Sequence, residues 1–153
     1  LIDAVPLPLF YKNKDGIYLG CNKAFEDFIG IKREDLVGRT VFELAPEDLA
    51  QIYYEKDNEL LQTGGIQIYE SRCESTDGAK RKVIFNKSLF TDLNGEKAGI
   101  VGAIFDVTEI KETEEMLRKY AKQLENSNEL KDIFTDVLSH DLLNHATVID
   151  GYT

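Results

Sequence analysis

The chain has 153 residues, a length that fits one compact domain with some additional structure. Its formal net charge of −10 argues against a nucleic-acid partner and a polybasic membrane anchor, because both need clustered Lys and Arg. A hydrophobic content of 42% suffices for a core, and no stretch approaches the ~18 apolar residues of a membrane helix. The two cysteines, Cys21 and Cys73, are too few for a disulfide framework or a CxxC metal site, so we expect no metal.

The composition changes near residue 107. Ten of the 11 Gly lie before it, whereas residues 107–153 hold one Gly, no Pro and many Glu, Lys and Leu. This shift predicts a globular first part and a helical second part. Because the chain begins at Leu1 and its only Met is Met116, we expect it to be a piece of a longer protein.

The first elements are expected to be a hairpin and several short helices. Segments 9–11 and 17–19 flank the turn Lys14-Asp15-Gly16, which is typical of a hairpin. Asn22 is placed to cap a helix that ends at Gly30, and segment 33–38 predicts one more helical turn. Pro46 should stand in the first turn of a longer helix that stops at residues 64–65, with an apolar face of Leu49, Ile52, Tyr53, Leu60 and Leu61.

Three strands follow the helices. They are expected at 66–74, 81–90 and 98–105, joined by the turns Asp77-Gly78 and Asn94-Gly95, which favour antiparallel hairpins. Two strands, several helices and three strands predict an α+β fold, with an antiparallel five-stranded sheet and the helices on one face. The long helix of the second part comes after it.

Four stretches of the first part occur in a characteristic order and spacing: DGIYLGCNKAFEDFIGI, EDLVGRT, ESTDGAKR and AGIVGAIFDVTE. Together they resemble a PAS sensor domain, over about residues 5–109, and we set the domain at 1–109. In that family an Asp-x-Thr closes the domain and starts the exit helix. The resemblance therefore implies that Asp106 and Thr108 relay the signal, and a short polar side chain suits a helix cap.

PAS domains often hold a small molecule between the sheet and the helices. No His precedes His140 to ligate a haem, and neither Cys lies in the Asn-Cys-Arg-Phe motif of flavin-binding LOV domains, so neither cofactor is expected. A small organic ligand, a metabolite or a plain core all stay open. Lys87 or Asn86 could fix a polar ligand group, although strand alternation lets only one point inward. The apolar candidates for the pocket are Leu19, Phe25, Phe28, Phe42, Tyr53, Tyr69, Phe85 and Ile104.

The second part predicts a signalling coiled coil over residues 110–129. Ile110, Leu117, Tyr120 and Leu124 recur at the spacing of a coiled-coil seam, and a helix this long needs a partner helix. A homodimer through parallel helices is the simplest solution. Residues 126–128, Asn-Ser-Asn, interrupt the seam, which indicates either a weak segment or a joint between two helix registers.

The last segment, ELKDIFTDVLSHDLLNHATVIDGYT, resembles the phosphoacceptor helix of a sensor histidine kinase, with the start of that domain at 130–153. The resemblance implies that His140 is phosphorylated from ATP and that Asn144 positions water for removing phosphate from a response regulator receiver domain. Asp141 is the candidate base and orienter of the imidazole. His145 stands where the family most often has Pro, which puts the usual helix kink in doubt.

The sequence thus predicts the cytoplasmic sensor and phosphoacceptor portion of a two-component histidine kinase. Its ATP-binding domain, with ATP and Mg²⁺, is expected outside this chain, so the chain alone should be inactive, and membrane attachment upstream of Leu1 stays open. The alternative is a non-enzymatic PAS module for dimerisation or ligand binding that controls another effector.

Overall fold

The structure, a computed structural model, describes the backbone of residues 1–151 and the side chains of residues 1–141 and 143. Contacts divide the chain into two units, Leu1–Glu109 and Ile110–Thr153. The elements of the first unit, in chain order, are a 3₁₀ turn at Ile2–Ala4, β1 (Leu9–Asn13), β2 (Tyr18–Cys21), α1 (Lys23–Ile29), α2 (Arg33–Leu36), α3 (Val41–Leu44), α4 (Glu47–Thr63), β3 (Ile66–Glu74), β4 (Lys80–Thr91) and β5 (Lys97–Asp106).

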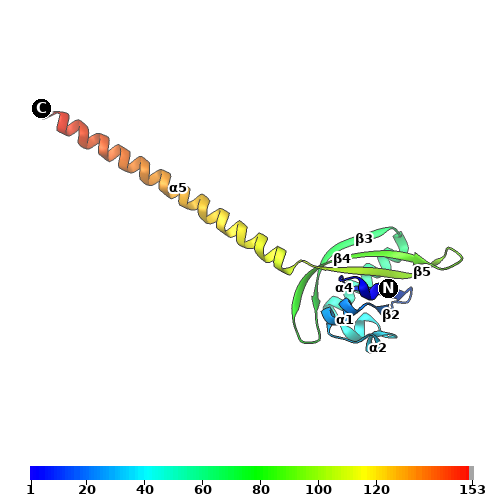
Figure 1. Cartoon of the computed structure of the whole chain (residues 1–153). Helices are drawn as coiled ribbons and strands as arrows, with labels where there is room; N and C mark the ends of the chain where they lie inside the picture. Colours follow the sequence, from blue (N-terminus) through cyan, green and yellow to red (C-terminus); the bar gives the residue numbers. More distant parts are fainter. Residues whose placement is uncertain (152–153) are drawn as a thin grey trace. The chain divides into compact units, whose positions relative to one another are not determined.

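The five strands form one antiparallel sheet in the order β2-β1-β5-β4-β3. Figure 1 draws this unit. The predicted α+β fold and its five-stranded antiparallel sheet are therefore confirmed. Short polar side chains close the turns between the strands. Asn13 Oδ1 accepts hydrogen bonds from the backbone N–H of Asp15 and Ile17, and Asp92 Oδ1 accepts from those of Asn94 and Glu96. These local bonds explain why the turn sequences were sufficient to predict the hairpins.

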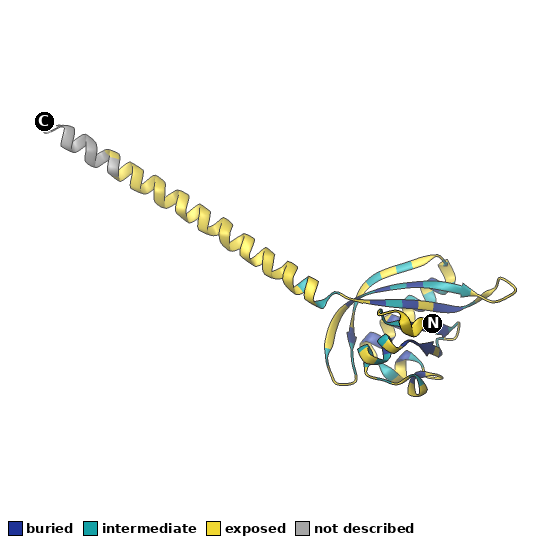
Figure 2. Ribbon diagram, in the orientation of Figure 1, coloured by how far each residue is buried: buried dark blue, intermediate teal, exposed yellow. Residues whose placement is uncertain are grey.

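The helices bury an aromatic core against one face of the sheet. The ring centroids of Phe10 on β1 and Phe25 on α1 lie 5.7 Å apart, and those of Tyr53 on α4 and Phe85 on β4 lie 5.2 Å apart. Figure 2 shows buried residues along the strands, and the edge strand β2 is among the buried ones. This aromatic cluster fixes how the helices lie over the strands, and so it shapes the space between them.

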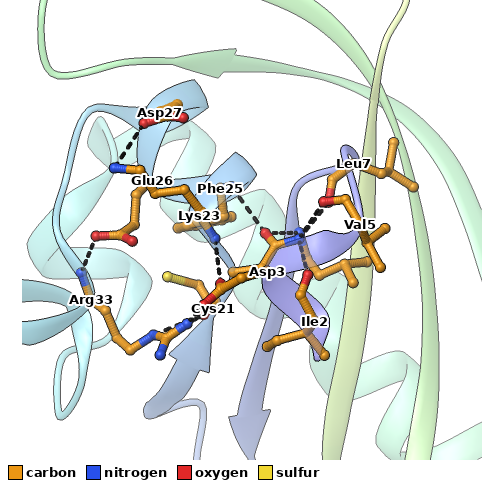
Figure 3. A network of polar contacts seen from close by, with 12 residues as sticks. Ile2, Asp3, Val5, Leu7, Cys21, Lys23, Phe25, Glu26, Asp27 and Arg33 are labelled. Atoms are coloured by element: carbon orange, nitrogen blue, oxygen red, sulfur yellow. Dashed lines mark hydrogen bonds and ion pairs between the residues drawn. The ribbon is translucent and has the colours of Figure 1, made fainter.

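Asn22 joins the start of the chain to the first helix, and Figure 3 labels its partners Phe25, Ile2, Val5 and Leu7. Its Oδ1 caps α1 by accepting from the Phe25 backbone N–H and also accepts from that of Leu9. Its amide nitrogen donates to the carbonyls of Ile2, Val5 and Leu7. The residue is fully buried, so these bonds replace all contact with water.

Replacing Asn22 with Ala should lower the free energy of unfolding by about 2–3 kcal/mol, because buried backbone groups lose their partner and α1 loses its cap. Urea unfolding followed by tyrosine fluorescence measures this. Asn94→Ala, at an exposed turn, is the matched control and should change stability by less than about 0.5 kcal/mol. Equal effects of the two changes would contradict the role of Asn22.

Helix α4 departs from the prediction at two places. Pro46 is the residue before the helix and not in its first turn. Ile52 is 41% exposed, although it was placed on the apolar face. The buried face instead consists of Leu49, Ala50, Tyr53, Asp57 and Leu60. A carboxylate therefore occupies a position at which the pattern alone predicts an apolar residue.

The second unit is the helix α5, which begins at Thr108 and extends to Gly151. It continues through residues 126–128, so the interrupted apolar pattern does not interrupt the helix. Beyond its first turn its described side chains are almost all exposed (Figure 2), including Ile110, Leu117, Tyr120 and Leu124. In the part of the chain that the structure describes, no helix combines the length and the apolar character needed to cross a membrane.

Candidate functional site

A cavity of about 50 Å³ lies between the sheet and the helices of the first unit. Most of its wall is apolar. Phe10, Phe85 and Ile104 come from the sheet, and Phe25, Leu36 and Val41 come from the helices. Lys12 on β1 and Lys87 on β4 are the basic side chains in the wall.

Both lysines are bound to one carboxylate. Lys12 Nζ donates to Asp57 Oδ2 and Lys87 Nζ donates to Asp57 Oδ1, each at 2.7 Å. The exposed fractions of the three residues are only 2%, 1% and 5% for Lys12, Lys87 and Asp57. We call these three residues the buried lysine cluster. Buried charges persist in proteins only when they are paired, and here one carboxylate bridges two cations.

Aromatic residues complete the surroundings of the cluster. Lys87 Nζ also donates to the Tyr69 hydroxyl at 2.7 Å. Lys12 Nζ lies 4.8 Å from the centroid of the Tyr18 ring, and Lys87 Nζ lies 4.9 Å from that of Phe85. These are favourable cation–π distances, so the rings replace part of the hydration that the two ammonium groups lose.

The electrostatics of the cluster follow from burial and pairing. Burial alone would raise the pKa of Asp57, but the attraction and hydrogen bonds of Lys12 and Lys87 outweigh it and hold the pKa below its usual 3.8. Burial lowers the pKa of Lys87 to about 8, despite the attraction of Asp57. At neutral pH the carboxylate is therefore ionised and Lys87 is still mostly protonated.

The neighbouring phenol of Tyr69 and thiol of Cys73 do not supply a second negative charge. Burial raises the pKa of the Tyr69 phenol, and it raises the pKa of the Cys73 thiol to about 11. Both groups are neutral at pH 7. The buried lysine cluster therefore carries one more positive than negative charge.

At the end of the sheet, Asp106 and Thr108 bind each other and the neighbouring strand. Asp106 Oδ1 accepts from the backbone N–H of Thr108 at 3.0 Å and from its hydroxyl at 2.6 Å, while Oδ2 pairs with Arg81 at 3.1 Å. Thr108 Oγ1 in turn accepts from the backbone N–H of Lys82 at 2.9 Å. These bonds connect the first turn of α5 with strands β4 and β5.

The histidine of the second unit lies on α5. His140 and Asp141 are both exposed, so the imidazole is accessible to a protein partner. Asn144, which was predicted to position water, has a side chain outside the described residues, and so does His145.

Residues 2–112 of this chain match the family described as the PAS fold. The chain belongs to the PAS family. The match covers the first unit except Leu1, together with the first residues of α5, so the buried lysine cluster and the cavity lie inside the PAS domain.

Three curated relatives are sensor proteins. The aerobic respiration control sensor protein ArcB of Escherichia coli is 28% identical over 98% of this chain, and the virulence sensor protein BvgS of Bordetella pertussis is 29% identical over 99%. The C4-dicarboxylate transport sensor protein DctS of Rhodobacter capsulatus is 26% identical over 92% of this chain. The chain spans only 18%, 12% and 22% of the lengths of these three relatives.

Solved structures of PAS proteins agree with the fold. The PAS domain of Bordetella pertussis BvgS is 26% identical with a TM-score of 0.61, over 80% of this chain and 92% of that one. A Vibrio cholerae VqmA dimer, a DNA-binding LuxR-type receptor, is 27% identical with a TM-score of 0.64, over 71% of this chain and 49% of that one.

Five of the predicted pocket residues line the cavity of the PAS domain. They are Phe25, Tyr53, Phe85, Lys87 and Ile104. Their ligand-binding role stays a prediction. Tyr69 packs against the core and binds Lys87 through its hydroxyl, without being part of the cavity wall.

Three other candidates lie outside the wall of the PAS cavity. Leu19 is 41% exposed, because Tyr18 points inward and strand alternation turns Leu19 to the other face. Phe42 is 48% exposed and packs on the Tyr54 ring, because Val41 takes the inward position of α3. Phe28 is partly buried and lies beneath the Arg81 guanidinium, 5.6 Å from it.

The sequence interpretation missed Lys12, Tyr18 and Asp57. The sequence contains weak signals for Lys12 and Asp57. Lys12 follows the buried Phe10 by two residues on a strand, which places it on the same face of the sheet. Asp57 lies four residues after Tyr53 and three before Leu60, on the apolar face of α4. A charged residue in phase with buried apolar residues on two separate elements indicates a buried ion pair.

Proposed function

We propose that this chain is the sensor and phosphoacceptor portion of a two-component sensor histidine kinase. The PAS domain receives a signal, the helix α5 transmits it, and His140 accepts phosphate from ATP bound to another domain. The phosphate then passes to the receiver domain of a response regulator. A homodimer through parallel α5 helices brings two copies of His140 into one assembly.

The extent of the similarity carries this proposal. The PAS match ends at residue 112, whereas the similarity to the ArcB sensor protein covers 98% of the chain. The similarity therefore extends beyond the PAS domain into the part of the chain that holds α5 and His140. The continuous course of α5 from Thr108 past the exposed His140 supports the same conclusion.

The chemistry suits an exposed histidine. An imidazole ring has two nitrogens, so one can act as the nucleophile while the other carries the proton. Its unprotonated ring nitrogen attacks the γ-phosphorus of ATP, the bond to the bridging oxygen breaks, and ADP leaves. Asp141 stabilises the proton on the other ring nitrogen, and Asn144 positions a water molecule when the phosphate is later removed from the receiver domain.

Phosphate transfer to His140 tests the proposal. The purified chain is incubated with radiolabelled ATP and a separately supplied ATP-binding domain of a sensor histidine kinase. Wild type should acquire an acid-labile phosphate, and His140→Ala should lose essentially all of it, because the nucleophile is gone. His145→Ala is the matched control, since these are the only two histidines of the chain, and it should retain the label.

The alternative function is a non-enzymatic PAS module that controls another effector. One observation favours it: the structural neighbour VqmA is a DNA-binding receptor. A folded chain whose label is the same in wild type and in His140→Ala would contradict the phosphoacceptor role and favour this alternative.

A further inference from the structure

The PAS cavity has two chemically different parts. At one side stand the ammonium groups of Lys12 and Lys87, each nine-tenths buried or more. The remainder of the wall is mostly hydrocarbon, including Phe25, Leu36 and Ile104. A molecule that matches this wall has one polar or anionic end and one short apolar end.

The charges favour an anionic end. A single carboxylate group, that of Asp57, bridges the two lysines, so the buried lysine cluster keeps an excess positive charge. Glu74 also lines the cavity, but it is partly exposed, so water screens its charge. An ammonium group has three N–H donors, and the bonds of Lys87 to Asp57 and Tyr69 use two of them. Lys87 thus has one donor left for a ligand oxygen.

The volume sets the size of the ligand. Since one water position needs roughly 10–15 Å³, the cavity of about 50 Å³ holds about three to five waters. A ligand that displaces them has a similar number of non-hydrogen atoms. Acetate and propionate fall in this range, whereas a flavin or a haem is far too large.

We propose that the PAS cavity binds a short aliphatic carboxylate, with the carboxylate on Lys87 and Lys12 and the alkyl end among the apolar residues. This inference names the ligand class of the sensor proposed above and rests on that role. Charge-assisted hydrogen bonds fix the carboxylate on two ammonium groups that are almost fully buried, where such bonds are stronger than at a surface. The small apolar part limits the length of the chain that fits.

Calorimetric titration of the whole chain with sodium propionate tests the inference. Propionamide, which has the same shape without the charge, is the matched ligand, and sodium chloride at equal ionic strength controls for salt. We expect one saturable site for propionate and binding at least about tenfold weaker for propionamide, since the charge-assisted bonds are lost. No saturable binding of propionate, or equal binding of both ligands, would overturn the inference.

A pair of lysine variants locates the site. Lys87→Met should bind propionate at least about tenfold more weakly, while Lys82→Met, at an exposed position of the same strand, should bind it as wild type does. Lys87→Met leaves Lys12 and Asp57 as a neutral pair, so the domain should still fold. Equal affinities of the two variants would place propionate elsewhere and overturn the inference. The comparison of propionate with propionamide needs no variant and remains decisive if Lys87→Met does not fold.

The kinase role and the ligand class can be refuted independently of each other. Phosphorylation of His140 does not enter the titration. A chain that binds propionate without accepting phosphate refutes the kinase role alone, and a chain that accepts phosphate on His140 without binding propionate refutes the ligand class alone.

Discussion

Replacing Asp57 with Asn should lower the free energy of unfolding by about 3–5 kcal/mol, because it leaves two buried ammonium groups without a counter-charge. Asp57 is the carboxylate that both Lys12 and Lys87 bind at 2.7 Å. The asparagine keeps the shape of the side chain, so the loss reports the charge and not a cavity. Urea unfolding of both proteins, followed by tyrosine fluorescence, measures the difference.

A second aspartate of the same helix is the control for this prediction. Asp48 pairs with Arg72 at 3.4 Å, but both side chains are about two-thirds exposed. Asp48→Asn should therefore cost less than about 1 kcal/mol, as is usual for surface ion pairs. If Asp57→Asn were no more destabilising than Asp48→Asn, the electrostatic account of the buried lysine cluster would be wrong.

Replacing both Leu117 and Leu124 with Glu should turn a dimeric chain into a monomer. The two leucines are 62% and 65% exposed on α5 and stand one heptad apart, so a parallel partner helix would bury them. Each buried leucine contributes about 1.5–3 kcal/mol, and a dimer contains four copies. We expect a loss of at least about 4 kcal/mol, or a dissociation constant raised about a thousandfold. Analytical ultracentrifugation over a range of concentrations measures this constant.

Added negative charge could itself separate two acidic helices. Lys119→Glu with Lys122→Glu therefore serves as the control, because it changes the charge more than the leucine variant does, at positions outside the seam. This control should remain a dimer. A wild-type chain that is monomeric at all concentrations, or a leucine variant that dimerises as wild type does, would contradict the coiled-coil interpretation.

Local chemistry made much of the fold predictable from the sequence. The hairpin turns depend on Asn13 and Asp92, whose side chains bond to backbone groups within four residues. The Asn22 cap and the left-handed Gly30 at the end of α1 are local in the same way. The strand ranges followed because the turns fix where each strand can begin and end. The Asp106–Thr108 contact also lies within three residues, and its motif indicated it.

The PAS cavity was less predictable, because long-range contacts build it. Lys12 and Asp57 are 45 residues apart, and Lys87 and Asp57 are 30 apart. Their pairing appears only when β1, α4 and β4 lie together, and no short motif encodes it. Leu19 and Phe42, in contrast, were predicted to line the cavity and lie outside its wall. Both are large apolar residues beside an inward neighbour, and hydrophobicity alone does not determine which of the two points to the core.

We propose that the PAS sheet controls phosphorylation of His140 through α5. The most direct measurement is the initial rate of phosphate transfer to His140 in Asp106→Ala, with the separately supplied ATP-binding domain. Asp106 bonds to Thr108 and Arg81 at the end of the sheet, far along the chain from His140. Asp92→Ala, which removes similar local bonds at the β4–β5 turn, is the control.

We predict that Asp106→Ala changes the transfer rate at least about fivefold, the lower end of typical coupling between sites, while Asp92→Ala leaves it unchanged. The unfolding midpoints of the two variants show that both remain folded under the assay conditions. A rate for Asp106→Ala equal to that of wild type would mean that the contacts at the end of the sheet do not reach His140, and it would contradict the account.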